Sequence, residues 1–158
     1  MKIPFVDLKQ QYINFKYEIN TAIDNVISET AFIKGKYVAL FEEEFALKCE
    51  SEYCVGVANG TDALFIILKM LAIGPGDEVI TTSLSWISTS ETISLTGAIP
   101  VFVDTDDYFL IDANKIEDKI SERTKAIIPV HLYGNPCDMR KIMMIANKYN
   151  LFIIEDCA

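Results

Sequence analysis

The sequence EVITTSLSWISTSETISLTGAIPVFV, residues 78–103, decides the fold because it passes from strand to helix to strand. Glu78–Thr82 and Pro100–Val103 are short and rich in β-branched or apolar residues, which is typical of buried strands. Ile87–Leu95, between them, is expected to be a helix. Strands that are apolar throughout are buried on both faces, and strands joined by helices pair in parallel. The stretch therefore predicts an α/β fold with a mostly parallel sheet flanked by helices.

The same alternation continues on both sides of this stretch. The sequence GPGD at residues 74–77 predicts a turn before the first strand. Three further strands are expected at Tyr53–Val57, Thr124–Val130 and Leu151–Ile154, and three further helices at Ala63–Leu71, Asp112–Ile120 and Asp138–Tyr149. The helix at Ala63–Leu71 is apolar nearly all round and is therefore expected to be buried. Asp112 is the expected N-cap of its helix.

Two amphipathic helices are expected before the α/β region. Apolar residues recur there every three or four positions, the spacing of one helix face. The first stripe consists of Tyr12, Phe15, Ile19, Ile23 and Val26, and the second of Val38, Phe41, Phe45 and Cys49. We therefore expect an amino-terminal helical segment, residues 1–50, followed by an α/β domain, residues 51–158.

The composition narrows the classes of function. The 158 residues include 14 Lys and Arg against 23 Asp and Glu, a net charge of −9, which argues against nucleic acid and anionic membranes as partners. No apolar run reaches the length of a membrane span, and the amino terminus lacks a signal-peptide core, so a cytoplasmic protein is expected. Four cysteines without ligand spacing and a single histidine give no support for a metal site.

Candidate site residues follow the expected strands, because ligands of open parallel sheets bind at the carboxyl ends of the strands. Gly60 and Thr61 open a helix whose free amides suit a phosphate, although a plain turn would use the same residues. The Asp62 carboxylate would repel a phosphate. We therefore expect the backbone N–H of Asp62 to bind the phosphate, and its side chain to cap the turn or point away. Trp86 is placed to stack on an aromatic ring, or is a core tryptophan. Asp156 needs a partner, either a cationic ring nitrogen or an ordinary ion pair.

Other motifs point away from common enzyme classes. His131 follows an apolar strand without a nearby Ser or Cys partner, so a structural histidine is the favoured interpretation. The chain contains neither GxxxxGK[ST] nor GxGxxG, which gives little support for a nucleoside triphosphatase or a standard dinucleotide-binding fold.

Several motifs occur together in an order that resembles one family. They are IPFVDL at 3–8, FIKG at 32–35, NGTDAL at 59–64, GPGDEV at 74–79, PVHLYG at 129–134 and EDCA at 155–158. Together they resemble the amino-terminal part of the DegT/StrS family of nucleotide-sugar aminotransferases, which are fold-type-I enzymes that use pyridoxal 5′-phosphate (PLP). Within that family the chain looks closest to enzymes that aminate a 3-keto-6-deoxyhexose carried on dTDP.

The resemblance implies a role for each candidate residue. Gly60, Thr61 and Asp62 would hold the PLP phosphate, Trp86 would stack on the pyridine ring, and Asp156 would bind the pyridine nitrogen and keep it protonated. The implied reaction moves an amino group, usually from glutamate, to a keto-sugar nucleotide. The resemblance also implies a dimer with its active sites at the subunit interface, and the loop at 32–38 would belong to that contact.

One departure from the family limits what this chain is expected to do. The sequence stops at Ala158, whereas the family continues with a glutamine, the lysine that forms the Schiff base and a serine that helps bind phosphate. The lysines that are present do not replace it: Lys125 begins a strand at the wrong edge, Lys69 and Lys115 are in helices, and Lys34 and Lys36 are on a flanking loop. We therefore expect a truncated large domain with no catalytic residue of its own and no turnover alone.

Three other interpretations stay open. The chain is compatible with a fragment of a related PLP-dependent sugar dehydratase in which histidine replaces the lysine. It is also compatible with a non-catalytic remnant or assembly partner of a full-length aminotransferase. A flavodoxin-like ligand-binding domain would show a glycine-rich loop near residue 10, where the sequence has a helical stripe instead.

Overall fold

The computed structural model describes residues 4–158, which form two compact units, one ending at Gly56 and the other comprising Val57–Ala158. In the first unit, α1 (Leu8–Ser28) and α2 (Lys36–Lys48) confirm the two predicted helices. The Asp7 side chain caps α1 by accepting a hydrogen bond from the backbone N–H of Gln10. Neither helix builds a core, because α1 buries none of its residues and α2 buries only Ala46.

The predicted strand at Tyr53–Val57 is wrong. These residues are irregular, and Tyr53 and Val55 are about three-quarters exposed. A strand requires a neighbour that accepts and donates backbone hydrogen bonds. The backbone N–H of Gly56 donates instead to a carboxylate oxygen of Glu42 at 2.7 Å, so a side chain takes the place of a ladder partner.

The second unit is built on a parallel sheet with the strand order β2-β1-β3-β4. The strands are β1 (Glu78–Thr82), β2 (Ile99–Val103), β3 (Thr124–Ile128) and β4 (Phe152–Ile153). All five residues of β1 are buried, as expected for a central strand covered on both faces. The mostly parallel α/β sheet predicted from the sequence is confirmed.

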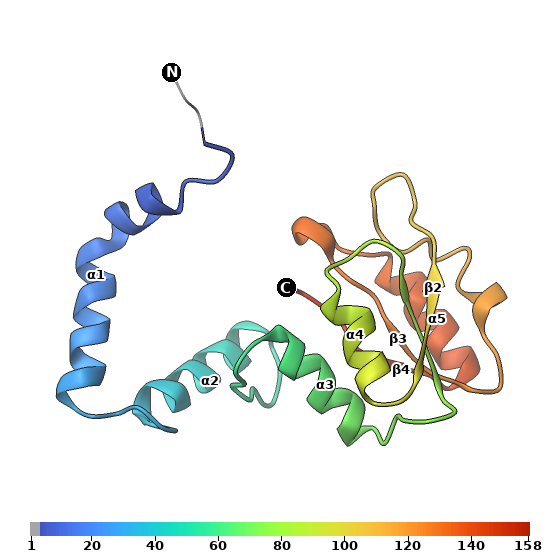
Figure 1. Ribbon diagram of the computed structural model, residues 1–158, viewed down its shortest axis with the longest axis horizontal. Helices are drawn as coiled ribbons and strands as arrows, with labels where there is room; N and C mark the ends of the chain where they lie inside the picture. The colour runs from blue at the N-terminus through green and yellow to red at the C-terminus, as the bar shows by residue number, and fades with distance from the viewer. Residues whose placement is uncertain (1–3) are drawn as a thin grey trace. The chain divides into compact units, whose positions relative to one another are not determined.

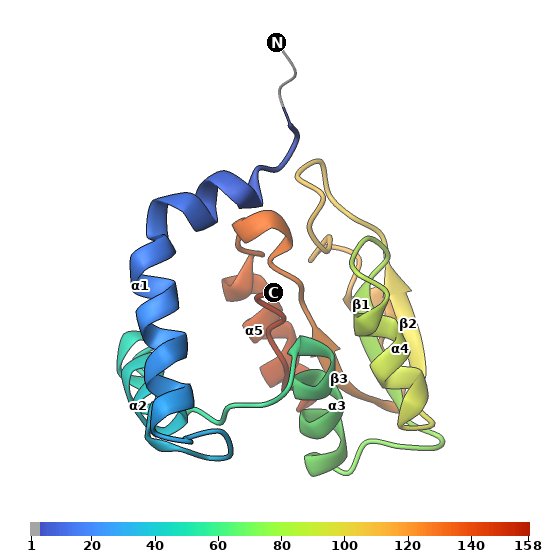
Figure 2. The same cartoon turned by 60° about the vertical axis from the view of Figure 1, so that its left-hand side comes forward.

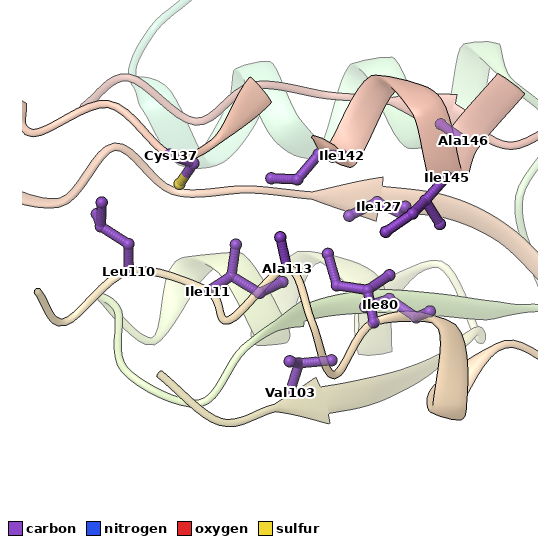
Figure 3. Packing of buried hydrophobic residues seen from close by; sticks show 11 residues of the cluster. Ile80, Val103, Leu110, Ile111, Ala113, Ile127, Cys137, Ile142, Ile145 and Ala146 are labelled. Atoms are coloured by element: carbon purple, nitrogen blue, oxygen red, sulfur yellow. The ribbon is translucent and has the colours of Figure 1, made fainter. Parts of the chain in front are cut away.

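Helices cover both faces of this sheet (Figures 1 and 2). On one face, α5 (Met139–Tyr149) packs Ile142, Ile145 and Ala146 against Ile80 and Ile127, as Figure 3 shows. On the other, α3 (Gly60–Met70) and α4 (Ser88–Leu95) pack against the sheet with a second core. That core contains Leu64, Leu68, Ile73, Val79, Ile93, Ala98, Ala126, Ile128 and Ile154.

Two details differ from the sequence-based expectation. The helix at Ala63–Leu71 is present as α3 but is not buried all round, since Ile66 and Ile67 are about 40% exposed. The helix expected at Asp112–Ile120 is only a short 3-10 turn, η1 (Glu117–Lys119). The Asp112 side chain accepts hydrogen bonds from the backbone N–H and the side-chain amide of Asn114, as a cap or a turn residue does, but only a turn follows it.

No helix within residues 4–158 combines the length and the apolar character that a membrane crossing requires.

Candidate functional site

Four of the five predicted site residues line one cavity in the second unit. The cavity has a volume of about 360 Å³, and it is lined by Gly60, Thr61, Leu64, Trp86, Ser88, Asp156 and Ala158. The predicted residue missing from its lining is Asp62. The segments that carry Trp86 and Asp156 follow β1 and β4, so the cavity lies at the carboxyl edge of the sheet, where ligands of such sheets bind.

The start of α3 forms one side of this cavity. Asn59 caps the helix, because its side-chain oxygen accepts a hydrogen bond from the backbone N–H of Asp62 at 2.8 Å. Its amide nitrogen donates to the Asp62 carboxylate at 3.0 Å. The backbone N–H of Asp62, expected to serve a phosphate, is thus already engaged. Within residues 4–158 the N–H groups of Gly60 and Thr61 have no acceptor, so they are the amides left for an anion.

Two further contacts lie on this side of the cavity: the bond between the Thr61 and Ser88 hydroxyls, and the approach of Ala158 to Gly60. The Thr61 hydroxyl donates to the Ser88 hydroxyl oxygen at 2.8 Å, and this bond joins the first turns of α3 and α4. Figure 2 shows the end of the chain near the start of α3, and a Cβ added at Gly60 would lie 3.8 Å from the Cβ of Ala158. The bare backbone of Gly60 therefore faces the cavity beside Ala158, with hydroxyl oxygens close by.

The opposite side of the cavity carries the Asp156 carboxylate in a fixed position. The backbone of Asp156 forms a parallel bridge with Val130: its N–H donates to the Pro129 carbonyl and its carbonyl accepts from the His131 N–H, both at 2.9 Å. One carboxylate oxygen accepts from the Thr89 hydroxyl at 3.1 Å and the other from the backbone N–H of Ala158 at 3.2 Å. No lysine or arginine within residues 4–158 forms an ion pair with it. The ordinary ion pair considered from the sequence is therefore not found in this part of the chain.

Trp86 is an exposed wall of the cavity and not a core residue. Its side chain is 79% exposed, although it lies only four residues beyond the fully buried β1. An aromatic ring placed at a cavity with so much free surface is available for stacking against a flat ligand. The alternative of a core tryptophan is therefore wrong.

His131 is a structural histidine, as its sequence context favoured. Its Nδ1 accepts a hydrogen bond from the backbone N–H of Cys137 at 3.1 Å, so that nitrogen carries no proton. The proton of the neutral ring is then on Nε2, which donates to Glu155 at 2.9 Å. Both ring nitrogens are satisfied, and the pair fixes the residue next to Asp156.

Sequence reasoning gave no role to three hydroxyl residues at or behind the cavity, although it placed Ser85 at this edge of the sheet: Ser85, Ser88 and Thr89. Ser88 lines the cavity, and Thr89 and Ser85 stand behind Asp156. The available signal was the run Ser88-Thr89-Ser90, which follows Trp86 and Ile87 in the segment after β1. Hydroxyls at the start of a helix are so often caps that this run does not distinguish a site from a helix end.

No lysine of the second unit, residues 57–158, lines this cavity. Lys125 is at the amino end of β3, where it lines a separate cavity of about 740 Å³ together with Thr124, Tyr149 and Phe152. This placement agrees with the expectation that Lys125 is at the wrong edge of the sheet. The residues that line the site contain no amine side chain.

Comparison with known proteins assigns the chain to a family. Residues 14–158 match the model of the DegT/DnrJ/EryC1/StrS aminotransferase family. The chain belongs to that family. The resemblance seen in the six sequence motifs is therefore confirmed.

The names of similar curated proteins describe aminotransferases that act on nucleotide sugars. A dTDP-3-amino-3,6-dideoxy-alpha-D-galactopyranose transaminase from Aneurinibacillus thermoaerophilus is 50% identical over 99% of this chain and 43% of its own length. A UDP-N-acetyl-3-dehydro-alpha-D-glucosamine 3-aminotransferase from Acidithiobacillus ferrooxidans is 46% identical over 99% of this chain and 42% of its own. The chain thus spans less than half the length of these relatives.

Solved structures of related proteins show the same fold. S. venezuelae DesV, in complex with a ketimine intermediate, superposes with a TM-score of 0.95 at 42% identity, covering 98% of this chain and 42% of DesV. NtdA from Bacillus subtilis, with bound cofactor PMP, gives a TM-score of 0.93 at 38% identity over 98% of this chain and 36% of its own. The chain corresponds to the amino-terminal part of a fold-type-I large domain.

Proposed function

We propose that this chain is the amino-terminal part of a PLP-dependent aminotransferase that transfers an amino group, with glutamate as donor, to a nucleotide-linked keto-sugar. The observation that carries the proposal is the single cavity shared by the amides of Gly60 and Thr61, the ring of Trp86 and the carboxylate of Asp156. Family membership supports the reaction class. We assign cofactor binding to residues 51–158, which contain every one of these groups.

The donor set of the cavity fits PLP at both of its charged ends. The unpartnered N–H groups at the start of α3 suit a phosphate, and the bare backbone of Gly60 lets an anion approach closely. The carboxylate of Asp156 has no cationic partner within residues 4–158 and suits a protonated ring nitrogen. Trp86 supplies the flat surface between the two ends.

Bound PLP supplies an electron sink for reactions at the carbon next to an amine. This chain's contribution is to hold and tune that group. Gly60 and Thr61 bind the phosphate through their N–H groups, while Asn59 and Asp62 fix the turn. Trp86 stacks on the ring, and Asp156 accepts the hydrogen bond of the ring N–H and so keeps that nitrogen protonated.

The substrate class follows from the names of the relatives. The transaminases of A. thermoaerophilus and S. venezuelae are named for dTDP sugars with an amino group at carbon 3, and the A. ferrooxidans and Pseudomonas aeruginosa relatives for UDP sugars with a keto group there. The shared feature is carbon 3. We therefore propose a 3-keto sugar nucleotide as the substrate, a dTDP-linked 3-keto-6-deoxyhexose in particular. The homodimer that the family resemblance implies is proposed as the assembly.

We expect the 158-residue chain to bind PLP without covalent attachment and to show no aminotransferase turnover, because the cavity has no amine in its lining. PLP binding is measured by quenching of Trp86, the only tryptophan of the chain. Borohydride reduction followed by mass spectrometry tests for a covalent link. A single stoichiometric adduct on one lysine would contradict the proposal of an inactive chain.

Asp156→Asn tests the site itself. Asn keeps the size of the side chain and an oxygen for the Ala158 N–H but loses the charge, so PLP affinity should fall about tenfold or more, the usual worth of a hydrogen bond to a charged group. Glu155→Gln is the matched control, because Glu155 is the adjacent carboxylate but bonds to His131. Equal PLP affinity in both variants would overturn the placement of the ring nitrogen at Asp156.

A further inference from the structure

We propose that Thr89, with Ser85 behind it, is a positioning residue that aims the Asp156 carboxylate at the ring nitrogen of the cofactor; this inference rests on the proposed function. Thr89 lies in the first turn of α4 and Asp156 follows β4, 67 positions apart in the sequence. The Thr89 side chain is only 2% exposed, and its hydroxyl meets the carboxylate at 3.1 Å.

The directions of the hydrogen bonds in this chain of groups are fixed by chemistry. An ionised carboxylate only accepts, so the single hydroxyl proton of Thr89 points to Asp156. The Ser85 hydroxyl is 3.0 Å from the Thr89 oxygen, and because the Thr89 proton is already used, Ser85 must be the donor. The order is Ser85 to Thr89 to Asp156, and each bond polarises the next.

Thr89 also bonds to the backbone of Trp86, the residue whose side chain lines the cavity. Its backbone N–H donates to the carbonyl of Trp86 at 3.2 Å, while its hydroxyl holds Asp156. The second carboxylate oxygen is held by the backbone N–H of Ala158 at 3.2 Å. Thr89 thus joins the carboxylate to the backbone of the residue that carries the aromatic ring, and each carboxylate oxygen accepts one bond from the protein and keeps a lone pair for a ligand.

The test compares PLP with its 1-deaza analogue, in which a C–H group replaces the ring nitrogen. Quenching of Trp86 gives the affinity of the 158-residue chain for each compound. We expect the unchanged chain to prefer PLP. Thr89→Val, which keeps the shape but lacks the hydroxyl, should weaken PLP binding about tenfold and leave the analogue unaffected. Thr89→Ser should restore PLP affinity, and Ser85→Ala should cause a smaller loss in the same direction.

The control is Thr92→Val. Thr92 is a fully buried threonine one turn along α4, and its hydroxyl bonds to the Thr89 carbonyl and not to Asp156. This variant should bind both compounds as the unchanged chain does. If Thr89→Val weakens both compounds equally, or keeps the full preference for PLP, the inference about Thr89 is overturned alone. If the unchanged chain binds the two compounds equally, or binds neither, the proposed role of Asp156 fails and the inference fails with it.

Discussion

At the scale of single residues, two partly buried aspartates differ in how their charge is compensated. Asp112 accepts two hydrogen bonds from Asn114 and forms an ion pair with Lys115 at 3.2 Å. Asp156 accepts one hydroxyl and one backbone N–H, and no lysine or arginine within residues 4–158 pairs with it. The charge of the Asp112 carboxylate is therefore compensated by the turn that contains it. The Asp156 carboxylate keeps its charge available for a ligand.

The Asp112 turn predicts a dependence of stability on pH. The backbone N–H of Asn114 is the main reason that the pKa of Asp112 lies below its ordinary value of 3.8, and the Asn114 amide and Lys115 lower the pKa further. A depressed carboxyl pKa stabilises the folded state above the unfolded-state pKa, and that stabilisation is lost as the pH falls through the folded-state pKa.

Asp112→Asn should therefore be less stable than the unchanged chain at pH 7, and the difference should vanish below the folded-state pKa. Urea unfolding followed by circular dichroism at a series of pH values measures this. The exposed Asp107 provides a control through Asp107→Asn, which should leave the profile unchanged. A difference between the two chains that stays constant from pH 7 into the acid range would contradict the account.

At the scale of elements, the first turn of α3 depends on one side chain. Asn59→Ala removes the acceptor for the Asp62 N–H, and loss of such a cap costs about 1 kcal/mol, or roughly a fivefold change in local opening. Amide hydrogen exchange should therefore be faster at Asp62, whose N–H loses its acceptor, while Asn59→Ser, which keeps an oxygen acceptor, should be close to the unchanged chain. Uniformly faster exchange from Val57 to Ala158 would show that the cap acts on the whole unit instead.

The elements that could be predicted from the sequence are those whose pattern reflects burial. Glu78–Thr82 is apolar or β-branched after its first residue, and it is β1 with the predicted bounds. The hydrophobic pattern gave a wrong prediction where a local polar contact accompanies a different backbone conformation. Tyr53–Val57 has the composition of a strand, but its Gly56 amide bonds to Glu42. Asp112 accepts from the Asn114 N–H, as an N-cap does, but a turn and not a helix follows it.

The site was predictable to the extent that strand ends define it. Gly60, Thr61, Trp86 and Asp156 all follow predicted strands or open helices, and the structure places them in one cavity. The pairing of Thr89 with Asp156 was not predictable, because it joins residues 67 positions apart through the packing of α4 beside the sheet. Nor does local sequence reveal that Asn59, and not a ligand, takes the Asp62 N–H.

At the scale of the whole chain, the first unit leaves its apolar residues uncovered. The stripe on α1 includes Phe15, Ile19 and Ile23, with 38–51% of each side chain exposed, and α1 buries no residue. Covering a large apolar side chain is worth about 1.5–3 kcal/mol. We therefore expect the 158-residue chain to associate with itself or with a longer family member.

Light scattering and a thermal melt measure this association. Replacing Phe15, Ile19 and Ile23 by Gln should increase the monomer fraction, because it removes the apolar stripe and keeps good helix formers. Lys16→Gln, an exposed position on the same helix, is the control and should change little. A monomer at micromolar concentration that melts cooperatively above about 50 °C, as a self-sufficient domain does, would contradict the expectation.

The strand order β2-β1-β3-β4 has a consequence for the chain during its synthesis. The central strand β1 leaves the ribosome first, yet both of its neighbours, β2 and β3, follow it in the sequence. The Thr81 hydroxyl bonds to the carbonyl of Ile128, which is added 47 residues later. At about 5–20 residues per second this takes roughly 2 to 9 s. During that interval β1, all of whose residues are buried in the folded sheet, has incomplete pairing, and we expect a chaperone that binds extended apolar segments to bind it then.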